Sequence, residues 1–367
     1  MWCSTLGTDP HIQLRPVGAT AMPAHVLRPQ TVLGDHKVTT SEIAEDVRLH
    51  HPDHPRLRAC LRVIENCGVR TRYFTRPLDS PTVAGAAGID ERTRVVFADV
   101  LAMAERAAFA ALDAAGLEAG DIDAIVTTHT TSWTVPNLDI NLIERLGLRP
   151  TVRRVALTTV ACPGGAQALI RAADLVAARP RSKVLVIAGE ALSGIYHHSD
   201  TSIESMIYKA LFGDAAAATV VTGEQLGPGL MIEDTFEYVL PNSVERQAGL
   251  VDRGGIHFVS TKQALSAAND VLPQLKAWIG TDHPEFAVIH PGSPRIITDT
   301  AAALGLSDHD ARHSSETLAH EGNIGGVSVL RVLERTHAEP PADGARGYTV
   351  AFGPGFATAA LRCRWLS

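Results

Sequence analysis

Residues 155–168, VALTTVACPGGAQA, place an apolar β-branched run directly before a cysteine, a proline, two glycines and an Ala-rich segment. This order predicts a strand, a sharp turn and a helix. Pro163 suits the first helical turn because it lacks an N–H that would stay unpaired there. Gly164 and Gly165 allow another backbone to approach closely. A buried strand that runs at once into a helix is typical of an α/β fold.

Cys162 stands at the turn of this stretch. A thiol before a helix faces unpaired N–H groups and the positive end of the helix dipole, and both favour the thiolate. Because the thiolate is the nucleophilic form of cysteine, the position suits nucleophilic catalysis. A core cysteine that happens to precede an ordinary helix remains the alternative for this stretch alone.

The alternation of helices and strands continues on both sides. KVLVIAG, residues 183–189, is apolar at consecutive positions, as in a strand buried on both faces. Residues 94–116 predict a helix that ends at Gly116. Further helices are predicted within 40–69 and at 137–146, 166–178, 263–279, 294–304 and 324–336, and strands at 123–128, 155–160, 215–221, 231–238, 286–289, 348–352 and 357–365.

The segment TGEQLGPG, residues 222–229, interrupts this pattern, which then starts again. We therefore predict a duplicated α/β unit, with residues 1–222 carrying Cys162 in the N-terminal half and residues 223–367 forming the C-terminal half. Both halves are expected to pack together rather than to act as independent domains.

Composition excludes several classes of protein. The 367 residues hold 33 Lys and Arg against 40 Asp and Glu, so there is no basic excess for nucleic acid. No apolar run approaches the roughly 18 residues of a membrane span, and the N-terminus lacks a signal-peptide pattern. Five cysteines without a CxxC pair argue against a disulfide framework and for a reducing compartment. We expect a soluble, cytoplasmic protein with no nucleic-acid or membrane partner.

The segment His50-His51-Pro52-Asp53-His54-Pro55 gathers three histidines. These side chains include metal-ligand types, but two prolines break any regular ligand geometry. We interpret the segment as a solvated turn between two helices, and we predict no metal site.

Two later polar residues stand in apolar or glycine-rich surroundings. His290 ends the apolar run FAVI, where a polar side chain needs a partner. Asn323 lies between Gly322 and a helix start, where a plain helix cap is the competing explanation. With Cys162 they supply a nucleophile, a base and an amide donor, which can meet only through the fold.

The chain resembles the type III polyketide synthases, the chalcone-synthase-like branch of the thiolase superfamily. The resemblance rests on an ordered set of short motifs spread over residues 60–360. These are Arg70-Thr-Arg-Tyr73, His129-Thr-Thr-Ser132 with Pro136, Ala161-Cys-Pro-Gly-Gly165, Leu211-Phe-Gly-Asp-Ala215, Gly255-Ile-His-Phe258, Ile289-His-Pro-Gly292, Gly322-Asn323 and Phe352-Gly-Pro-Gly355.

The resemblance implies a thiolase fold, a five-layered αβαβα stack of two related halves, and a homodimer. It implies that Cys162 accepts the acyl group, while His290 and Asn323 raise its thiolate character, with His290 holding the thiolate as an ion pair. Both would also stabilise the enolate left by decarboxylation of a malonyl thioester. The implied substrates are acyl-CoA and malonyl-CoA, with no metal or redox cofactor, and an acyl carrier protein is an alternative donor.

The resemblance also assigns residues to the cavity and its access tunnel. Phe212 and Phe258 match two gatekeeping phenylalanines, although core packing is the usual role of Phe. Arg58, Arg62 and Lys262 match or adjoin positions that bind CoA phosphates, whereas Ala59 and Asn66 stand where the family has lysines. The expected cavity-shaping positions are Thr131, Ser132, Trp133, Ile195, Gly249 and Gly325.

The implied reaction is loading of an acyl starter onto Cys162, repeated decarboxylative condensation with malonyl-CoA, and release of a cyclised pyrone or phenol. Residues 128–131 lack the second cysteine of the tetrahydroxynaphthalene synthases, which argues against a malonyl-primed naphthol synthase. The alternatives are a β-ketoacyl synthase that performs one condensation, an acyltransferase with a non-malonyl acceptor, a papain-like cysteine hydrolase, and a nonenzymatic scaffold of the same fold.

Overall fold

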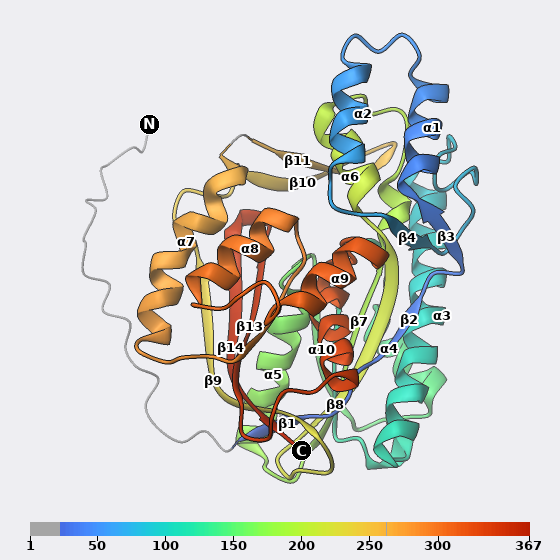
Figure 1. The fold of residues 1–367 in the computed structure, drawn as a ribbon. Helices are drawn as coiled ribbons and strands as arrows, with labels where there is room; N and C mark the ends of the chain where they lie inside the picture. Colours follow the sequence, from blue (N-terminus) through green and yellow to red (C-terminus); the bar gives the residue numbers. More distant parts are fainter. Residues whose placement is uncertain (1–22, 262) are drawn as a thin grey trace, which may run out of the picture.

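The computed structural model describes residues 23–261 and 263–367, and it is built around one long, strongly wound sheet (Figure 1). The strand order is β12-β13-β14-β9-β1-β8-β7-β5-β6, and β2 pairs with β8. The bounds are β1 (Ala24–Val26), β2 (Gln30–Leu33), β5 (Ala124–His129), β6 (Arg153–Thr158), β7 (Lys183–Ala191), β8 (Asp214–Thr222), β9 (Gly229–Val239), β12 (Phe286–Ile289), β13 (Arg346–Gly353) and β14 (Ala357–Leu366).

Strand β1 joins the two parts of the sheet, because it pairs with β8 on one side and with β9 on the other. Within the first part, β5 runs parallel to β6 and β7, and within the second, β12 runs parallel to β13. The segment between β8 and β9 contains the predicted interruption. The division into residues 1–222 and 223–367 stays a prediction.

The two parts of the sheet form two layers, and helices form three more. α3 (Ile89–Ala115) and α4 (Leu138–Leu146) share a core with the first part of the sheet, and α7 (Ala264–Ile279), α8 (Pro294–Ala303) and α9 (Arg312–Glu321) pack with the second. α5 (Gly164–Ala178) and α10 (Ser328–Ala338) contribute to a central core that contains strands of both parts. The predicted five-layered α/β architecture is confirmed.

A projection at one end of the molecule stands beside the sheet (Figure 1). It contains α1 (Thr40–His50), α2 (Leu57–Glu65), α6 (Ile203–Leu211) and the paired strands β3 (His36–Thr39) and β4 (Thr71–Phe74), which share an apolar core. Thr39 and Glu42 form a reciprocal capping box at the start of α1. The two predicted helices with a turn between them are confirmed.

The most strongly patterned elements match the sequence closely. The predicted helix at 94–116 begins five residues earlier, at Ile89, and ends at Gly116 with a φ of +63°, a left-handed cap that suits glycine. The predicted helix at 324–336 opens instead with a 3₁₀ turn, η3 (Gly325–Val327), before α10 begins. Other 3₁₀ turns are η1 (Ala119–Asp121), η2 (Leu192–Ile195) and η4 (Pro354–Phe356).

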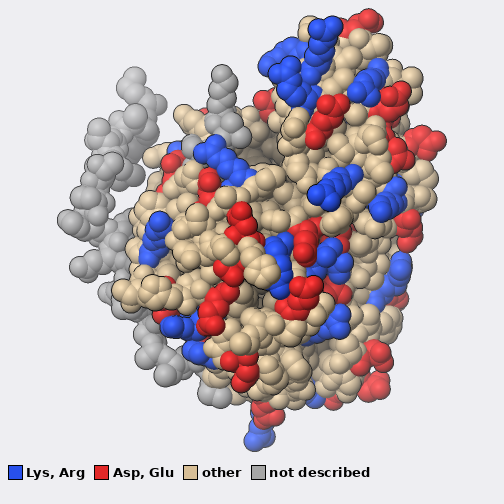
Figure 2. Space-filling model, in the orientation of Figure 1, with Lys and Arg blue, Asp and Glu red and all other residues tan. Residues whose placement is uncertain are grey.

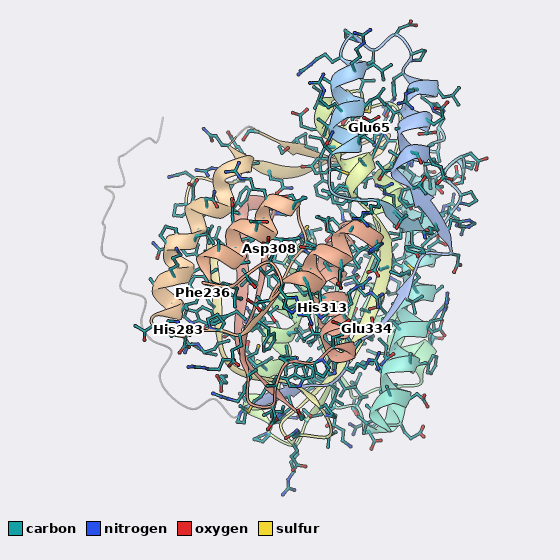
Figure 3. All side chains as sticks on the ribbon, viewed as in Figure 1. Glu65, Phe236, His283, Asp308, His313 and Glu334 are labelled. Carbon is teal, nitrogen blue, oxygen red and sulfur yellow. The ribbon has the colours of Figure 1, made fainter. Side chains whose placement is uncertain are left out.

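The sequence analysis did not predict α6, α9 or the hairpin β10 (Gln247–Asp252) and β11 (Gly255–Ser260). Helix α9 has the sequence RHSSETLAHE, and its buried face is largely polar, so no apolar periodicity indicates it. Side chains fill the space between the layers, as where Phe236 of β9 stacks on Trp278 of α7 with ring centroids 5.3 Å apart (Figure 3). Among residues 23–261 and 263–367, no helix combines the length and apolarity that a membrane span requires.

Candidate active site

Cys162 lies in the turn between β6 and α5. Ala161 before it has a φ of +56°, a left-handed conformation that costs energy for a residue with a Cβ atom. The Ala161 N–H donates to Thr130 Oγ1 at 3.0 Å, and the Ala161 carbonyl accepts from the Gly164 N–H at 2.9 Å. These bonds hold the thiol directly before the N-terminus of α5.

Asn323 reaches the same turn from the opposite part of the chain. Its backbone N–H donates to the Leu211 carbonyl at 2.8 Å, and its carbonyl accepts from the Gly213 N–H at 3.1 Å. The side-chain Oδ1 accepts from the Gly325 N–H at 2.9 Å. This bond fixes the orientation of the amide, so that Nδ2 faces Cys162 Sγ at 4.0 Å.

Two glycines make this approach sterically feasible. A Cβ atom on Gly165 would lie 2.2 Å from the Gly326 carbonyl oxygen, and one on Gly353 would lie 2.2 Å from Pro163 Cδ. Gly165 therefore lets the segment after Asn323 pack on α5. Gly353 lets the loop after β13 pack on the Cys162 turn.

His290 follows β12, where its N–H donates to the Val350 carbonyl at 2.8 Å. Its ring is buried, and neither ring nitrogen has a hydrogen-bond partner. Cys162, His290 and Asn323 all line one cavity of about 840 Å³, a size in the range of small-molecule sites. The fold thus brings together the three residues that the sequence analysis selected.

Burial sets the electrostatics of this cavity. Burial, with a smaller effect of the Glu190 carboxylate, raises the pKa of the Cys162 thiol to about 12, and the Asn323 amide opposes this only in part. Burial lowers the pKa of His290 to about 3. The expected preference for thiolate at the helix N-terminus is therefore outweighed.

Glu190 is a site residue that the sequence analysis missed. It lies buried on β7, where Oε2 accepts from the Thr130 N–H at 3.2 Å. Burial raises the pKa of Glu190 to about 7, although hydrogen bonds from Thr130 and Thr131 act in the opposite direction. A carboxylate within the apolar run KVLVIAGEA was the signal for this residue, because buried charges need specific partners.

Phe212 lines the cavity and meets Phe258 edge to face, with ring centroids 6.0 Å apart. Tyr208 stacks on Phe212 at 5.2 Å and also lines the cavity. Gly249 pairs with Phe258 across the β10–β11 hairpin. Phe258 and Gly249 thus stand behind Phe212 rather than on the cavity surface.

The other predicted cavity-shaping positions fall in different places. A Cβ atom on Gly325 would lie 3.1 Å from Glu190 Cγ, and Thr131 Oγ1 accepts from the Ala191 N–H at 3.2 Å. Ser132 is buried, and its hydroxyl has no partner. Ile195 lines a gap with Phe212 that is too narrow for a water molecule.

Trp133 differs from the expectation. Its exposed fraction is 50%, and it is absent from the lining of the cavity. It follows the end of β5 in an irregular segment that runs to α4, where the chain leaves the core and the indole ring reaches the surface.

Basic side chains lie at the open end of the cavity. Arg62 of α2 and Asn66, directly after that helix, line one side, and Arg295 of α8 lines the cavity too. Figure 2 shows the molecule hollowed between the projection and the body, with Lys and Arg on both sides. Arg58, one turn before Arg62, is exposed and does not line the cavity.

Lys262 lies outside the described residues, so the structure does not place it. Arg295 was missed by the sequence analysis, although it follows the His290-Pro-Gly motif by three residues. Its guanidinium pairs with Asp299 at 3.1 Å and remains largely exposed.

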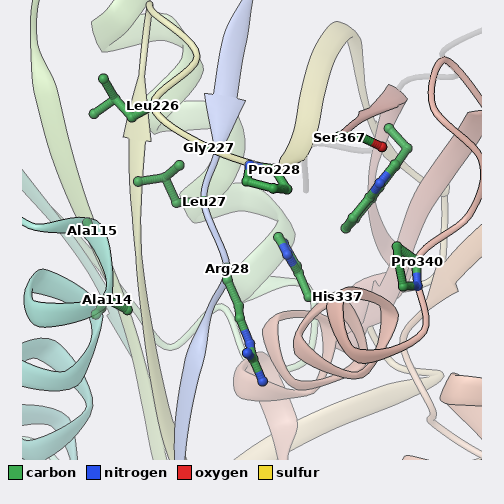
Figure 4. A pocket seen from close by; sticks show the side chains of 12 residues that line it. Leu27, Arg28, Ala114, Ala115, Leu226, Gly227, Pro228, His337, Pro340 and Ser367 are labelled. Carbon is green, nitrogen blue, oxygen red and sulfur yellow. The ribbon is translucent and has the colours of Figure 1, made fainter.

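A second pocket, of about 410 Å³, lies near the C-terminus (Figure 4). Leu27, Arg28, His337 and Trp365 are among the residues that line it. Neither a cysteine nor any predicted site residue is among the residues that line it.

Comparisons with known proteins agree with this geometry. Residues 15–225 match the family model of chalcone and stilbene synthases, N-terminal domain. The chain is 33% identical to 1,3,6,8-tetrahydroxynaphthalene synthase of Streptomyces coelicolor over 90% of each chain. It is 31% identical to phloroglucinol synthase of Pseudomonas fluorescens, over 90% of this chain and 95% of that protein.

Solved structures show the same similarity. The crystal structure of the S. coelicolor tetrahydroxynaphthalene synthase covers 94% of this chain with a TM-score of 0.89, and 99% of that structure is matched. Germicidin synthase from the same organism also gives 0.89, at 29% identity, over 94% of this chain and 100% of that one. The chain therefore belongs to the chalcone and stilbene synthase family and is a type III polyketide synthase.

Proposed function

We propose that this enzyme condenses malonyl-CoA with an acyl starter held as a thioester on Cys162 and releases a cyclised pyrone or phenol. One observation carries the proposal. Cys162, His290 and Asn323 come from three distant segments and line one cavity, with the Asn323 amide 4.0 Å from the thiol sulfur.

Acyl loading begins when Cys162 Sγ attacks the carbonyl carbon of an acyl-CoA. As the S–C bond forms, His290 accepts the thiol proton, and it returns that proton to the CoA thiolate as the C–S bond breaks. Burial keeps His290 neutral, because it lowers the pKa of the imidazole to about 3. The neutral ring has a free lone pair, but it is a weak base on its own, so it takes the proton only as the forming thiolate stabilises the imidazolium beside it.

Chain extension requires an enolate of acetyl-CoA, which forms when the malonyl C–C bond breaks and CO₂ leaves. The negative charge develops on the thioester oxygen. The N–H groups of His290 and Asn323 are suitable donors to that oxygen, and Asn323 is already oriented by its bond from the Gly325 N–H. The enolate carbon then attacks the carbonyl carbon of the Cys162 thioester, the bond from that carbon to Sγ breaks, and Cys162 leaves as the thiolate with the extended chain held on CoA.

The acyl donors are CoA thioesters in this proposal, and no metal or redox cofactor takes part. Arg62 and Arg295 would face the CoA phosphates at the open end of the cavity, with Arg58 nearby. Lys262 is a further candidate from the resemblance. A carrier-protein-bound acyl group is an alternative donor with the same thioester chemistry.

We also propose a cytoplasmic homodimer. Trp133, Val135 and Ile140 are exposed apolar side chains that follow β5, with exposed fractions of 50%, 100% and 41%. Apolar side chains close together on a surface favour a protein interface. A reducing compartment would keep Cys162 as a thiol. Light scattering should give twice the monomer mass, and Val135→Asp should lower it.

The relatives described above are named as synthases of tetrahydroxynaphthalene, phloroglucinol and germicidin. Residues 128–131 contain no cysteine, which argues against a malonyl-primed naphthol product. Product class depends on the volume behind Phe212 and Phe258.

The proposal is tested by incubating the purified enzyme with malonyl-CoA and a panel of acyl-CoAs and by measuring CO₂, free CoA and product mass. Cys162→Ala should abolish condensation. Cys67→Ala is the matched control, because Cys67 lines the same cavity. Full condensation by Cys162→Ala would overturn the mechanism, and a product mass after one extension would indicate a single-condensation synthase.

A further inference from the structure

A cluster of imidazole and carboxylate side chains lies in the projection, outside the cavity of Cys162. Asp46 and His50 are one turn apart on α1, and His198 comes from the segment between η2 and α6. One ligand atom of each residue lies within 4.8 Å of the other two. Three metal-binding side chains from two distant segments thus converge on one point.

We propose that Asp46, His50 and His198 bind one divalent transition-metal ion of the zinc class. Two imidazole nitrogens and one carboxylate oxygen are a common ligand set for Zn²⁺. The fourth position would remain open to solvent on the side of His50, whose side chain is 38% exposed.

Binding one ion requires a change in the rings. His50 and His198 stack with centroids 3.9 Å apart and an interplanar angle of 10°, and because a ring nitrogen binds a metal in the plane of its ring, the exposed His50 ring would turn out of this stack. His50 Nδ1 lies 3.2 Å from Asp46 Oδ1, and His198 Nε2 lies 2.9 Å from Asp46 Oδ2. His198 Nε2 is a buried atom, and its close polar neighbour is that carboxylate oxygen. The ion would replace the contact between His50 Nδ1 and the Asp46 carbonyl at 2.9 Å.

Neighbouring side chains are arranged as outer partners of such a site. His51 Nε2 lies 2.8 Å from His198 Nδ1, and the Tyr196 hydroxyl donates to Asp46 Oδ2 at 2.5 Å. When His198 donates its Nδ1–H to His51, the lone pair of Nε2 is available to the ion. Partners of this kind orient metal ligands and fix their tautomers.

The positive charge that faces this cluster is Lys209, whose Nζ lies over the Tyr196 ring and bonds to Ser205 Oγ at 2.6 Å.

The sequence analysis rejected a metal site because Pro52 and Pro55 interrupt the histidine segment. Those prolines follow His50, so they do not disturb the Asp46 and His50 pair on α1. The third ligand, His198, is 148 positions further along the chain than His50 and could not be associated with that segment from spacing. A bound ion would tie α1 to the segment that leads into α6.

The test uses the full untagged chain, stripped with a chelator and titrated with Zn²⁺ by calorimetry and with Co²⁺ by visible absorption. We expect one ion per chain. His50→Gln and His198→Gln should lose detectable binding, and His51→Gln should weaken it about 10- to 100-fold. His54→Gln and the exposed His36→Gln are matched controls and should bind as the wild type does.

His50 lies at the surface, so His50→Gln should fold normally and keep the test decisive. Binding that survives both His50→Gln and His198→Gln, or that His54→Gln removes, would overturn the assignment. Absence of stoichiometric Zn²⁺ binding by the wild type would do the same and would leave the cluster as a hydrogen-bonded contact.

Discussion

At the scale of single residues, we expect the Glu190 carboxylate to affect the reactivity of Cys162. Its carboxylate raises the pKa of the thiol, although less than burial does. Glu190→Gln removes that charge, and we expect the rate of Cys162 alkylation by iodoacetamide at pH 8 to rise about threefold to tenfold, since one pKa unit is a tenfold change in thiolate. Peptide mass mapping would measure the rate at Cys162 alone.

The pH dependence of this effect follows from the pKa of Glu190. Burial raises that pKa to about 7, so the wild-type carboxyl is mostly neutral at pH 6 and mostly charged at pH 8. The ratio of variant to wild-type rates should be near one at pH 6 and should increase above pH 7. Glu204→Gln, which also alters a carboxylate of the cavity, is the control. A ratio at or below one at pH 8 contradicts the prediction.

Asn323 offers a second test at this scale. Asn323→Asp replaces the amide donor near Cys162 Sγ with a carboxylate, which raises the pKa of the thiol and removes a donor for the enolate oxygen. We expect malonyl-CoA decarboxylation to fall about 10²- to 10³-fold. Asn269→Asp, at another position of the cavity lining, is the control. A comparable loss in both variants would indicate a general charge effect.

The sequence was sufficient to select Cys162, His290 and Asn323, because each is a polar residue at the end of an apolar run or beside a glycine. Arg295 was missed because a surface arginine carries no signal until the cavity around it is known. Trp133 was expected at the cavity because only its position in a motif was used. The exposure of the Trp133 side chain depends on where the chain leaves the core, and the spacing of motifs carries no information about that point.

At the scale of elements, the contact between α5 and η3 positions the nucleophile against Asn323. Gly165→Ala places a Cβ atom 2.2 Å from the Gly326 carbonyl oxygen. Alanine favours a helix over glycine, but this overlap should outweigh the gain and lower the free energy of unfolding by about 1–3 kcal/mol. Urea unfolding would measure it.

Gly120→Ala is the matched control, because nothing lies within 4 Å of its added Cβ atom. Its free energy of unfolding should stay within about 0.5 kcal/mol of the wild type. Equal stability of the two variants would show that η3 moves away from α5 without cost.

Elements with a strong pattern were predictable from sequence alone. α3 has no proline and ends at a glycine, and β12 is apolar at every position, so local preference and packing agree. α9 was not predictable because it buries Ser314, Thr317 and Glu321 rather than an apolar stripe. Its Glu321 is satisfied by Arg331 and Arg335 of α10, a partnership that exists only in the folded chain.

At the scale of the whole molecule, several titrating groups determine how stability depends on pH. Burial lowers the pKa of His197 and His337 to about 4 and that of His290 to about 3. Histidines of the unfolded chain bind protons near pH 6.5, so unfolding takes up protons between about pH 4 and 6.5. Stability from these groups is therefore lost as pH falls through this range.

Two buried carboxyl groups act in the opposite direction. Burial raises the pKa of Glu190 to about 7 and that of Asp214 to about 6, so unfolding releases their protons at intermediate pH. Their contribution makes stability fall as pH rises. His51, with a pKa near 4, joins the three histidines above. Four groups that take up protons outweigh two that release them, so net stability should decrease from pH 6.5 to pH 4.5.

His337 allows this balance to be tested away from the active site. Its ring packs on Trp365 with centroids 4.7 Å apart, in the second pocket. His337→Gln removes one proton from the uptake on unfolding, so the slope of the free energy of unfolding against pH should decrease by about 1.4 kcal/mol per pH unit near pH 5.5. Urea unfolding from pH 4.5 to 7.5, with a chelator present, would measure this slope. The exposed His36→Gln should leave the slope unchanged. A His337→Gln curve parallel to the wild type would contradict this prediction, because it would show that His337 takes up no proton on unfolding.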